Sequence, residues 1–283
     1  MPPGDSPWLH EEIASRMIER LAFIRLQPAS WWHWEAVRGG MAAHKALRDR
    51  YDQAQTWVST QSALNPQSLL GLLNPPWWQA RRWLGSPVHA GHPAEGQVQM
   101  VWANMALHTQ AHPQDLLAQW HRALAVDGFL MFSCFGPDTL GELRELYRSR
   151  GWGEPSHAFT DMHDWGDMLV ETGFAEPVMD MERLTLTYET PERLLAELRG
   201  LGRNLHRHRF QGLRGRQWHL ELLRSLHSLA RPDQQGRLAL TFEVVYGHAI
   251  KPAPKARLQA QTALSVHDMR QMLRSSDPPG RKV

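Results

Sequence analysis

Basic side chains are concentrated in one segment of the chain. Residues 199–219 contain no acidic side chain, and they hold three histidines and six arginines, namely Arg199, Arg203, Arg207, Arg209, Arg214 and Arg216. A cluster of positive charge attracts and orients an acidic partner. The segment is therefore a candidate docking surface, with Arg199, Arg203, Arg207 and Arg209 as candidate contacts. A solvated basic face without a partner is the alternative.

Two short clusters have residue types that bind metals. His206 and His208 are two residues apart, and Asp161 is followed closely by His163 and Asp164. Imidazole and carboxylate groups are common ligands of transition metals. Paired histidines are a known ligand geometry on strands, but both clusters fall in segments expected to be loop or helix. The sequence therefore predicts no metal site.

Two further residues have reactive or polar side chains. Tyr188 ends an alternating apolar segment, and it is a candidate substrate contact or a core tyrosine with its hydroxyl at the rim. Cys134 lies in a continuous apolar run and is expected to be inert packing. As the single cysteine, it excludes an internal disulfide and any cysteine-based zinc cluster.

Composition excludes several classes of protein. The 283 residues are 42% hydrophobic and carry a formal charge of +2, which is unlike a wholly disordered chain. No apolar run approaches the roughly 18 residues of a membrane helix. The first residues lack the basic start and apolar stretch of a secretory signal, so a cytoplasmic location is expected. The mild basic excess does not favour nucleic acid as a partner.

The elements that position these residues alternate between strand and helix along the first part of the chain. This alternation predicts a parallel sheet with helices on both faces. Ser6 is expected to cap the first helix, and residues 65–96 are expected to be irregular, with Trp77, Trp78 and Trp83 covering part of the sheet. A first strand and its turn are predicted over 31–40, and further strands over 56–59, 98–103 and 129–134. The predicted helices are 7–28, 41–51, 113–124, 137–147 and 163–172.

The pattern changes after residue 180. Apolar residues alternate over 184–188 and again over 238–246, which predicts two half-buried antiparallel strands. Helical signals between them, over about 190–231, predict an insert. We therefore expect one domain over residues 1–250 and a partly disordered tail over 251–283.

Four segments resemble one family. They are residues 102–108, 132–144, 159–167 and 173–188, and they include the runs Gly-Pro-Asp-Thr-Leu and Asp-Met-His-Asp. Over roughly residues 8–250 the chain resembles a class I S-adenosylmethionine-dependent methyltransferase. In particular, it is similar to the malonyl-acyl-carrier-protein O-methyltransferase of biotin synthesis. The resemblance implies a Rossmann-like three-layer α/β sandwich with a helical lid inserted between its last two antiparallel strands.

The resemblance also implies an activity. In this family, S-adenosylmethionine donates a methyl group to the carboxylate of a malonyl group, which an acidic acyl carrier protein presents. The reaction needs no metal and little acid-base chemistry, because a carboxylate is already a nucleophile and positioning supplies most of the rate. The implied cofactor-binding positions are Gly39, Ala103 and Asn104.

The chain departs from the family at the first turn. His33 stands where the family has an acid, and Glu35 and Val37 replace two glycines, so that only Gly39 of the Gly-x-Gly-x-Gly turn remains. At the end of the second strand, Ser59 or Thr60 replaces the acid that binds the ribose. The two new turn side chains are expected to occupy cofactor space and weaken its binding. The alternatives are a non-catalytic protein that still binds the carrier, or a different ligand stacked on the tryptophans.

Overall fold

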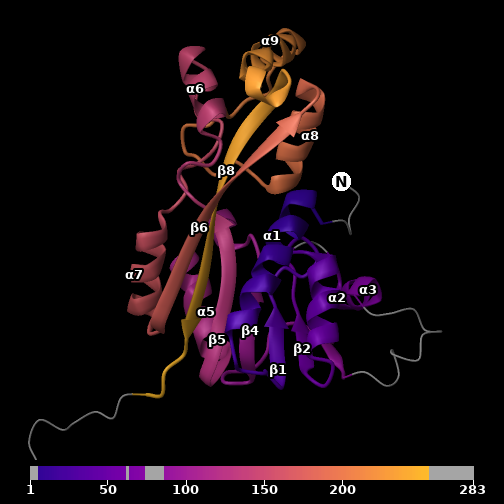
Figure 1. Ribbon diagram of the computed structural model, residues 1–283, viewed down its shortest axis with the longest axis vertical. Helices are drawn as coiled ribbons and strands as arrows, with labels where there is room; N and C mark the ends of the chain where they lie inside the picture. The colour runs from indigo at the N-terminus through magenta and orange to yellow at the C-terminus, as the bar shows by residue number, and fades with distance from the viewer. Residues whose placement is uncertain (1–5, 62–63, 74–85, 255–283) are drawn as a thin grey trace, which may run out of the picture. The chain divides into compact units, whose positions relative to one another are not determined.

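The computed structural model describes residues 6–61, 64–73 and 86–254. The chain divides into two compact units, Met1–Pro252 and Ala253–Val283. All of the described helices and strands lie in the first unit (Figure 1). The predicted tail after residue 254 and the expected cover by Trp77, Trp78 and Trp83 lie outside the described residues.

One mixed sheet runs through the first unit in the order β3-β2-β1-β4-β5-β8-β6, with β7 paired to β8. The strands β1 to β5 are parallel to one another, and β8 is antiparallel to both β5 and β6. This is the predicted α/β architecture. The strands are β1 (Ser30–His33), β2 (Gln55–Val58), β3 (Val88–Ala90), β4 (Val98–Ala103), β5 (Leu124–Phe135), β6 (Ala175–Tyr188), β7 (Ala230–Arg231) and β8 (Arg237–Ile250).

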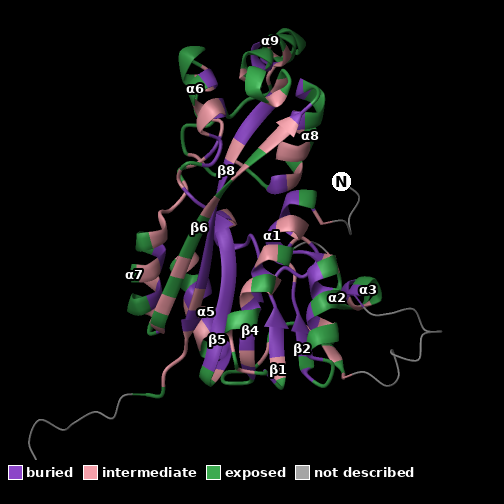
Figure 2. Cartoon of the chain, in the orientation of Figure 1, coloured by how far each residue is buried: buried purple, intermediate pink, exposed green. Residues whose placement is uncertain are grey.

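Helices cover both faces of the sheet, because alternate strand residues point to opposite sides. Trp31 belongs to the core cluster under α1 and α2, whereas Trp32 belongs to the cluster under α5 and α7. The central strands are consequently buried along most of their length (Figure 2). The α-helices are α1 (Trp8–Arg20), α2 (Met41–Arg50), α3 (Pro66–Leu73), α5 (Pro113–Ala123), α6 (Gly141–Ser149), α7 (Met162–Thr172), α8 (Pro191–Leu201) and α9 (Arg216–Leu226), and the 3-10 turns are η1 (Leu21–Phe23), η2 (Leu107–Thr109), η3 (His227–Leu229) and η4 (Pro232–Gln234).

Some of the local predictions are wrong. The first helix was expected to reach residue 28, but it ends with η1 at Phe23. Residues 65–96 are not wholly irregular, because they contain both α3 and β3. Helix α3 packs Leu69 and Leu73 against β2 and the turn after β1. Ser6 does not cap α1. Its hydroxyl donates to the carbonyl of Val37 at 2.6 Å and accepts from the N–H of Met41 at 3.0 Å, so it stabilises the start of α2 instead.

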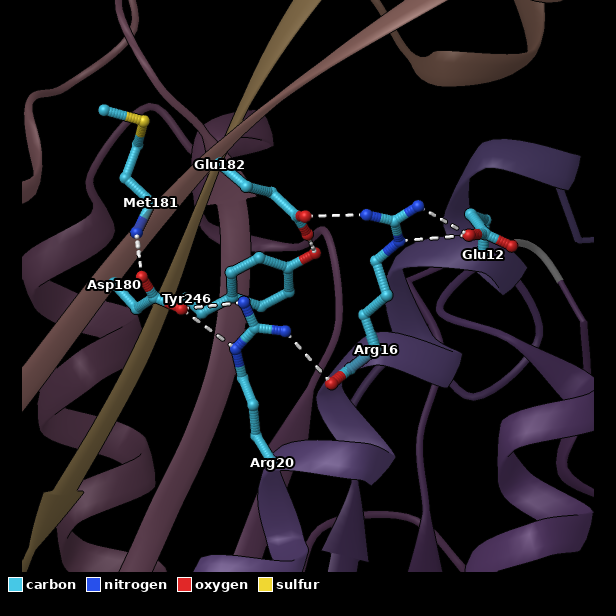
Figure 3. A network of polar contacts seen from close by, with 7 residues as sticks. All are labelled: Glu12, Arg16, Arg20, Asp180, Met181, Glu182 and Tyr246. Carbon is cyan, nitrogen blue, oxygen red and sulfur yellow. Dashed lines mark hydrogen bonds and ion pairs between the residues drawn. The ribbon is translucent and has the colours of Figure 1, made fainter.

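The first helix is fixed to the antiparallel strands by a charged network (Figure 3). Arg16 binds Glu182 of β6 at 2.6 Å, and Arg20 binds Asp180 at 2.7 Å. The Arg20 guanidinium also lies 3.8 Å from the ring centre of Tyr246 in β8, whose hydroxyl donates to Glu182. Single exposed ion pairs contribute little, but this connected set links three elements. It holds α1 in place beside the first turn of the sheet.

The helices α8 and α9 lie between β6 and β8 in the chain, and with α6 they surround the far ends of these strands (Figure 1). The hydroxyl of Thr190 accepts a hydrogen bond from the N–H of Arg193 at 3.3 Å, which caps α8. Gly202 then ends the helix with a φ of 152°. We refer to residues 190–231 as the helical insert.

A glycine is required at position 247, where β8 pairs with Phe132 of β5. A Cβ atom at this position would lie 2.2 Å from a ring carbon of Phe132, which is buried and cannot move aside. Gly247→Ala is therefore expected to lower the free energy of unfolding by about 1–3 kcal/mol or more, as overpacked cores do. Urea unfolding followed by tryptophan fluorescence measures this change. Gly141→Ala is the control, because its added Cβ would meet no atom within 4 Å from elsewhere in the described residues. Equal midpoints for the two variants would contradict the packing.

Candidate functional site

An open cavity of about 430 Å³ lies at the carboxyl ends of the parallel strands, and we call it the main cavity. It is placed where the strand order reverses, because β1 pairs with β2 on one side and with β4 on the other. Open α/β sheets bind their ligands at such a reversal. The lining residues come from the turns after three strands and from the helical insert: Glu35, Arg38, Gln61, Asn104, Met105, Ala106, Thr109, Gly202, Arg203 and Leu205.

Glu35 forms one wall of the main cavity. Its backbone has a φ of 57°, which turns the chain directly after β1. Its carboxylate reaches the end of β2, where it accepts hydrogen bonds from the N–H of Gln61 and from the hydroxyl of Thr60. Burial raises the pKa of this carboxyl, while the Gln61 hydrogen bond and the positive charge of Arg38 act in the opposite direction. A carboxylate from the first turn thus stands beside the end of the second strand.

The other turn substitution lies elsewhere. Val37 packs with Val58, Leu69 and Leu73 in a small hydrophobic cluster beneath α3, and it is not among the residues that line the main cavity. His33 is also removed from the cavity wall. It is fully buried and stacked on His44 of α2, with their Nδ1 atoms 3.1 Å apart. Val37 was expected to occupy ligand space. Its side chain instead packs in the hydrophobic cluster, away from the main cavity.

Asn104 fastens the floor of the main cavity. Its side-chain amide donates to the carbonyls of Gly39 at 2.6 Å and His10 at 2.8 Å, and its side-chain oxygen accepts from the Ser133 hydroxyl at 2.6 Å. Gly39 fits here because a Cβ would lie 2.9 Å from the Glu35 carbonyl oxygen. Gly39 and Asn104 are thus brought together below the cavity, whereas Ala103 is fully buried in the core facing α5 and α7.

The five residues proposed as substrate or partner contacts are separated by the structure. Arg203 lines the main cavity. Arg199, Arg207 and Arg209 are exposed on the helical insert, and within the described ranges none of them has an ion-pair partner. Tyr188 lines a different groove, beside Arg193 and Glu197 of α8, and its buried hydroxyl has no hydrogen-bond partner in the part of the chain that the structure describes.

Sequence reasoning missed three of the polar side chains that line the main cavity. Arg38 precedes Gly39 in the first turn, and its guanidinium donates to the carbonyl of Gly200 in α8 at 3.3 Å. Gln61 follows β2 by a few residues, and Thr109 lies in η2. Their places after predicted strands were a usable signal for Arg38 and Gln61. No local pattern indicates Thr109.

Buried histidines surround the first turn and should make stability depend on pH. Burial lowers the pKa of His10 to about 4 and that of His44 to about 3, and it lowers the pKa of His33 and His108 well below the usual range. Below about pH 6.5 the unfolded chain therefore binds more protons than the folded one, and each such histidine removes up to about 1.4 kcal/mol of stability per pH unit. Protonation of both His33 and His44 would also set two N–H donors against each other.

We therefore expect the free energy of unfolding to fall steeply from pH 7 to pH 5. Urea midpoints measured across this range test the expectation. His44→Phe removes one of these groups and should make the dependence shallower, whereas the same change at exposed His112 should leave it unaltered. A midpoint that does not change with pH would contradict neutral, buried histidines.

Other classes of site find no support in the described ranges. There, no group of three or more histidine, cysteine, aspartate or glutamate side chains is placed to hold a metal ion. His206 and His208 are neighbours, with ring centres 5.5 Å apart, but no third such ligand joins them among the described residues. None of the helices described is both long and apolar enough to span a membrane.

The sheet order and the cavity at its reversal define a Rossmann-like class I methyltransferase fold. The YcgJ protein of Bacillus subtilis has this fold with a TM-score of 0.55 and 12% identity, over 86% of this chain and 100% of that one. A proposed methyltransferase of Bacillus halodurans C-125 has a TM-score of 0.52 and 14% identity, also over 86% of this chain and 100% of that one.

Sequence relatives identify the family. The malonyl-[acyl-carrier protein] O-methyltransferase of Gallionella capsiferriformans is 41% identical over 261 residues, covering 87% of this chain and 85% of the relative. The enzyme of the same name from Laribacter hongkongensis is 38% identical over 260 residues, covering 88% and 84%. The chain belongs to the malonyl-[acyl-carrier protein] O-methyltransferase family. No family model matches it.

Proposed function

We propose that this protein transfers the methyl group of S-adenosylmethionine to the free carboxylate of a malonyl group held on an acyl carrier protein. The observation that carries the proposal is the main cavity. It lies at the reversal of strand order in a chain of this family, and it is lined by charged and polar groups from the turns after β1, β2 and β4. The chain has a single cysteine, which excludes an internal disulfide. This is in keeping with a cytoplasmic location.

The residues of the main cavity fit S-adenosylmethionine. This molecule has a carboxylate, an ammonium group, a ribose diol and an adenine ring. The Arg38 guanidinium would pair with the carboxylate, and Gln61 offers a carboxamide. The Glu35 carboxylate accepts one hydrogen bond at each oxygen and retains capacity for two more, so it would bind the ribose hydroxyls. An acid at the end of the second strand commonly has this role in dinucleotide-binding folds, and Glu35 reaches that place from the first turn.

The chain's own part in catalysis is positioning. When bound, S-adenosylmethionine supplies an electrophilic methyl group, whose transfer to a carboxylate oxygen leaves a neutral thioether and a neutral ester. The acceptor carboxylate needs no general base, so the residues of the site have to orient it and exclude water. Asn104 holds the first turn against α1, and Arg38 connects that turn to the helical insert through the Gly200 carbonyl.

Methyl transfer to malonyl carrier protein tests the proposal. Purified protein, S-adenosylmethionine and malonyl-loaded carrier should yield carrier with the mass of one added methyl group, sensitive to esterase. Acetyl-loaded carrier, which has no free carboxylate, should gain nothing. If the malonyl carrier also gains nothing but still binds, the chain would be the non-catalytic carrier-binding protein.

The carrier would dock on the exposed arginines of the helical insert. The acyl carrier proteins that serve as substrates in this family are acidic. Arg199, Arg207 and Arg209 have no ion-pair partner in the described part of the chain. Arg207→Glu combined with Arg209→Glu is expected to weaken carrier binding about 10- to 100-fold and to flatten its salt dependence. Calorimetric titration with the carrier measures both effects. Arg25→Glu, an exposed change far from the insert in sequence, is the control; equal losses in the two variants would refute this docking face.

A further inference from the structure

A second, smaller cavity of about 110 Å³ opens beside the main one, and we call it the inner cavity. It shares Thr109, Gly202 and Arg203 with the main cavity, so the two adjoin at these residues. A single water needs about 10–15 Å³ of such volume, so the inner cavity has room for a small acyl group. Most of its wall is apolar and comes from β5, β8, α6, α8 and the segments on either side of α6: Phe135, Leu140, Leu143, Phe159, Leu198, Leu201 and Phe242.

Two polar side chains in this wall have unused hydrogen-bonding groups. The His108 Nδ1 atom accepts from the N–H of Phe135 at 3.4 Å, so the proton of the neutral ring is on Nε2. Both His108 Nε2 and the Ser156 hydroxyl are buried, and neither has a hydrogen-bond partner among the described residues. Burial lowers the pKa of His108, so the ring stays neutral. Because an unpaired buried donor costs about 1–3 kcal/mol, these groups indicate a ligand that carries an uncharged acceptor.

The junction of the two cavities, unlike the apolar wall of the inner cavity, carries a positive charge. Arg203 is exposed there, and its guanidinium has no ion-pair partner among the described residues. A guanidinium recognises a carboxylate by paired hydrogen bonds. A ligand that spans junction and inner cavity therefore combines a carboxylate with a neutral carbonyl a short distance away.

From this arrangement we infer that Arg203 and His108 position the acyl acceptor of the proposed reaction in the inner cavity. Arg203 binds the carboxylate at the edge of the main cavity, and the Nε2–H of His108 donates to the thioester carbonyl. The inference rests on the proposed function, since it names how that acceptor is held. Both residues are positioning residues in this scheme. Transfer of a methyl group removes the charge that Arg203 recognises, which favours release of the ester.

Binding of two small thioesters separates these roles from catalysis. Malonyl-N-acetylcysteamine and butyryl-N-acetylcysteamine are alike in length, but only the first has a carboxylate, and neither includes the carrier. Calorimetry in the presence of saturating S-adenosylhomocysteine should show that the full-length protein prefers the malonyl compound. Arg203→Gln should lower that affinity about 10- to 100-fold, the value of a charged hydrogen bond. Arg203→Lys should restore part of it, and Arg224→Gln, an exposed change on α9 that lines neither cavity, should leave it unchanged.

His108→Phe should weaken both thioesters, because it removes the carbonyl donor, and His108→Gln, which keeps an N–H donor, should recover binding. Because His108→Phe also removes the acceptor of the Phe135 N–H, its urea midpoint is measured as a check of folding; a purely structural histidine would lower this midpoint and leave the thioester affinity of the folded protein unchanged. Equal binding of the malonyl and butyryl compounds, a preference that survives Arg203→Gln, or no binding at millimolar concentration would overturn the inference. Each result is independent of methyl transfer, which tests the proposed function.

Discussion

Asn104→Ala is expected to lower the free energy of unfolding by about 3–5 kcal/mol. The Asn104 side chain makes three hydrogen bonds in the core, to the carbonyls of His10 and Gly39 and to the hydroxyl of Ser133. Truncation leaves these partners buried and unpaired, at about 1–3 kcal/mol each. Because the His10 carbonyl belongs to α1 and the Gly39 carbonyl to the first turn, the change also loosens the floor of the main cavity.

Urea unfolding followed by tryptophan fluorescence gives this value directly. The matched control is Asn65→Ala, which deletes the same atoms from an exposed residue that accepts one hydrogen bond, from the N–H of Ser68. That control should cost about 1 kcal/mol, as loss of a helix cap does. A loss for Asn104→Ala no larger than that of Asn65→Ala would contradict the role of Asn104 as a buried clamp.

Glu35→Gln is expected to weaken S-adenosylhomocysteine binding by about 10- to 100-fold, the value of a charge-assisted hydrogen bond. The substitution keeps the shape of the side chain and one oxygen for the N–H of Gln61, but it removes the negative charge and one acceptor. The alternative, in which Glu35 merely fills ligand space, predicts the reverse. On that view Glu35→Gly should improve affinity, since it would also relieve the positive φ of 57°.

Isothermal titration with S-adenosylhomocysteine and with its 2′,3′-dideoxyribose analogue separates the two views. The wild type should lose affinity for the dideoxy compound, whereas Glu35→Gln should bind the two ligands almost equally. Glu95→Gln is the control, because that side chain is 81% exposed and does not line the main cavity. A Glu35→Gly variant that binds more tightly than the wild type would show that the first turn obstructs the cofactor.

Much of the sheet could be predicted because its strands are simple apolar runs. The predicted strand over residues 98–103 agrees with β4, since both faces of this strand are covered and the run is bounded by polar residues. Helix α3 was missed because the prolines and glycines around it dominate the local signal, although Leu69 and Leu73 have helical spacing. Ser6 was assigned to the nearest helix in sequence, whereas the fold brings it to α2.

The candidate site depends on contacts between residues far apart in the chain. The Asn104 side chain reaches His10 across 94 residues and Gly39 across 65. Family resemblance places Asn104 at the site, but no periodic pattern encodes this clamp. The sequence shows that a glutamate occupies position 35 of the turn, but it does not show where the side chain points. The positive φ of Glu35 directs its carboxylate toward the end of β2. The inner cavity likewise forms only when the helical insert meets β5 and α6.

The central claim is that the main cavity binds S-adenosylmethionine although its first turn departs from the family pattern. Isothermal titration of S-adenosylhomocysteine into the wild-type protein tests it most directly, because the product is stable and binds without an acceptor. The charged and polar groups of the cavity predict one site per chain with micromolar affinity. No detectable heat of binding at millimolar ligand, from protein that unfolds cooperatively, would contradict the claim.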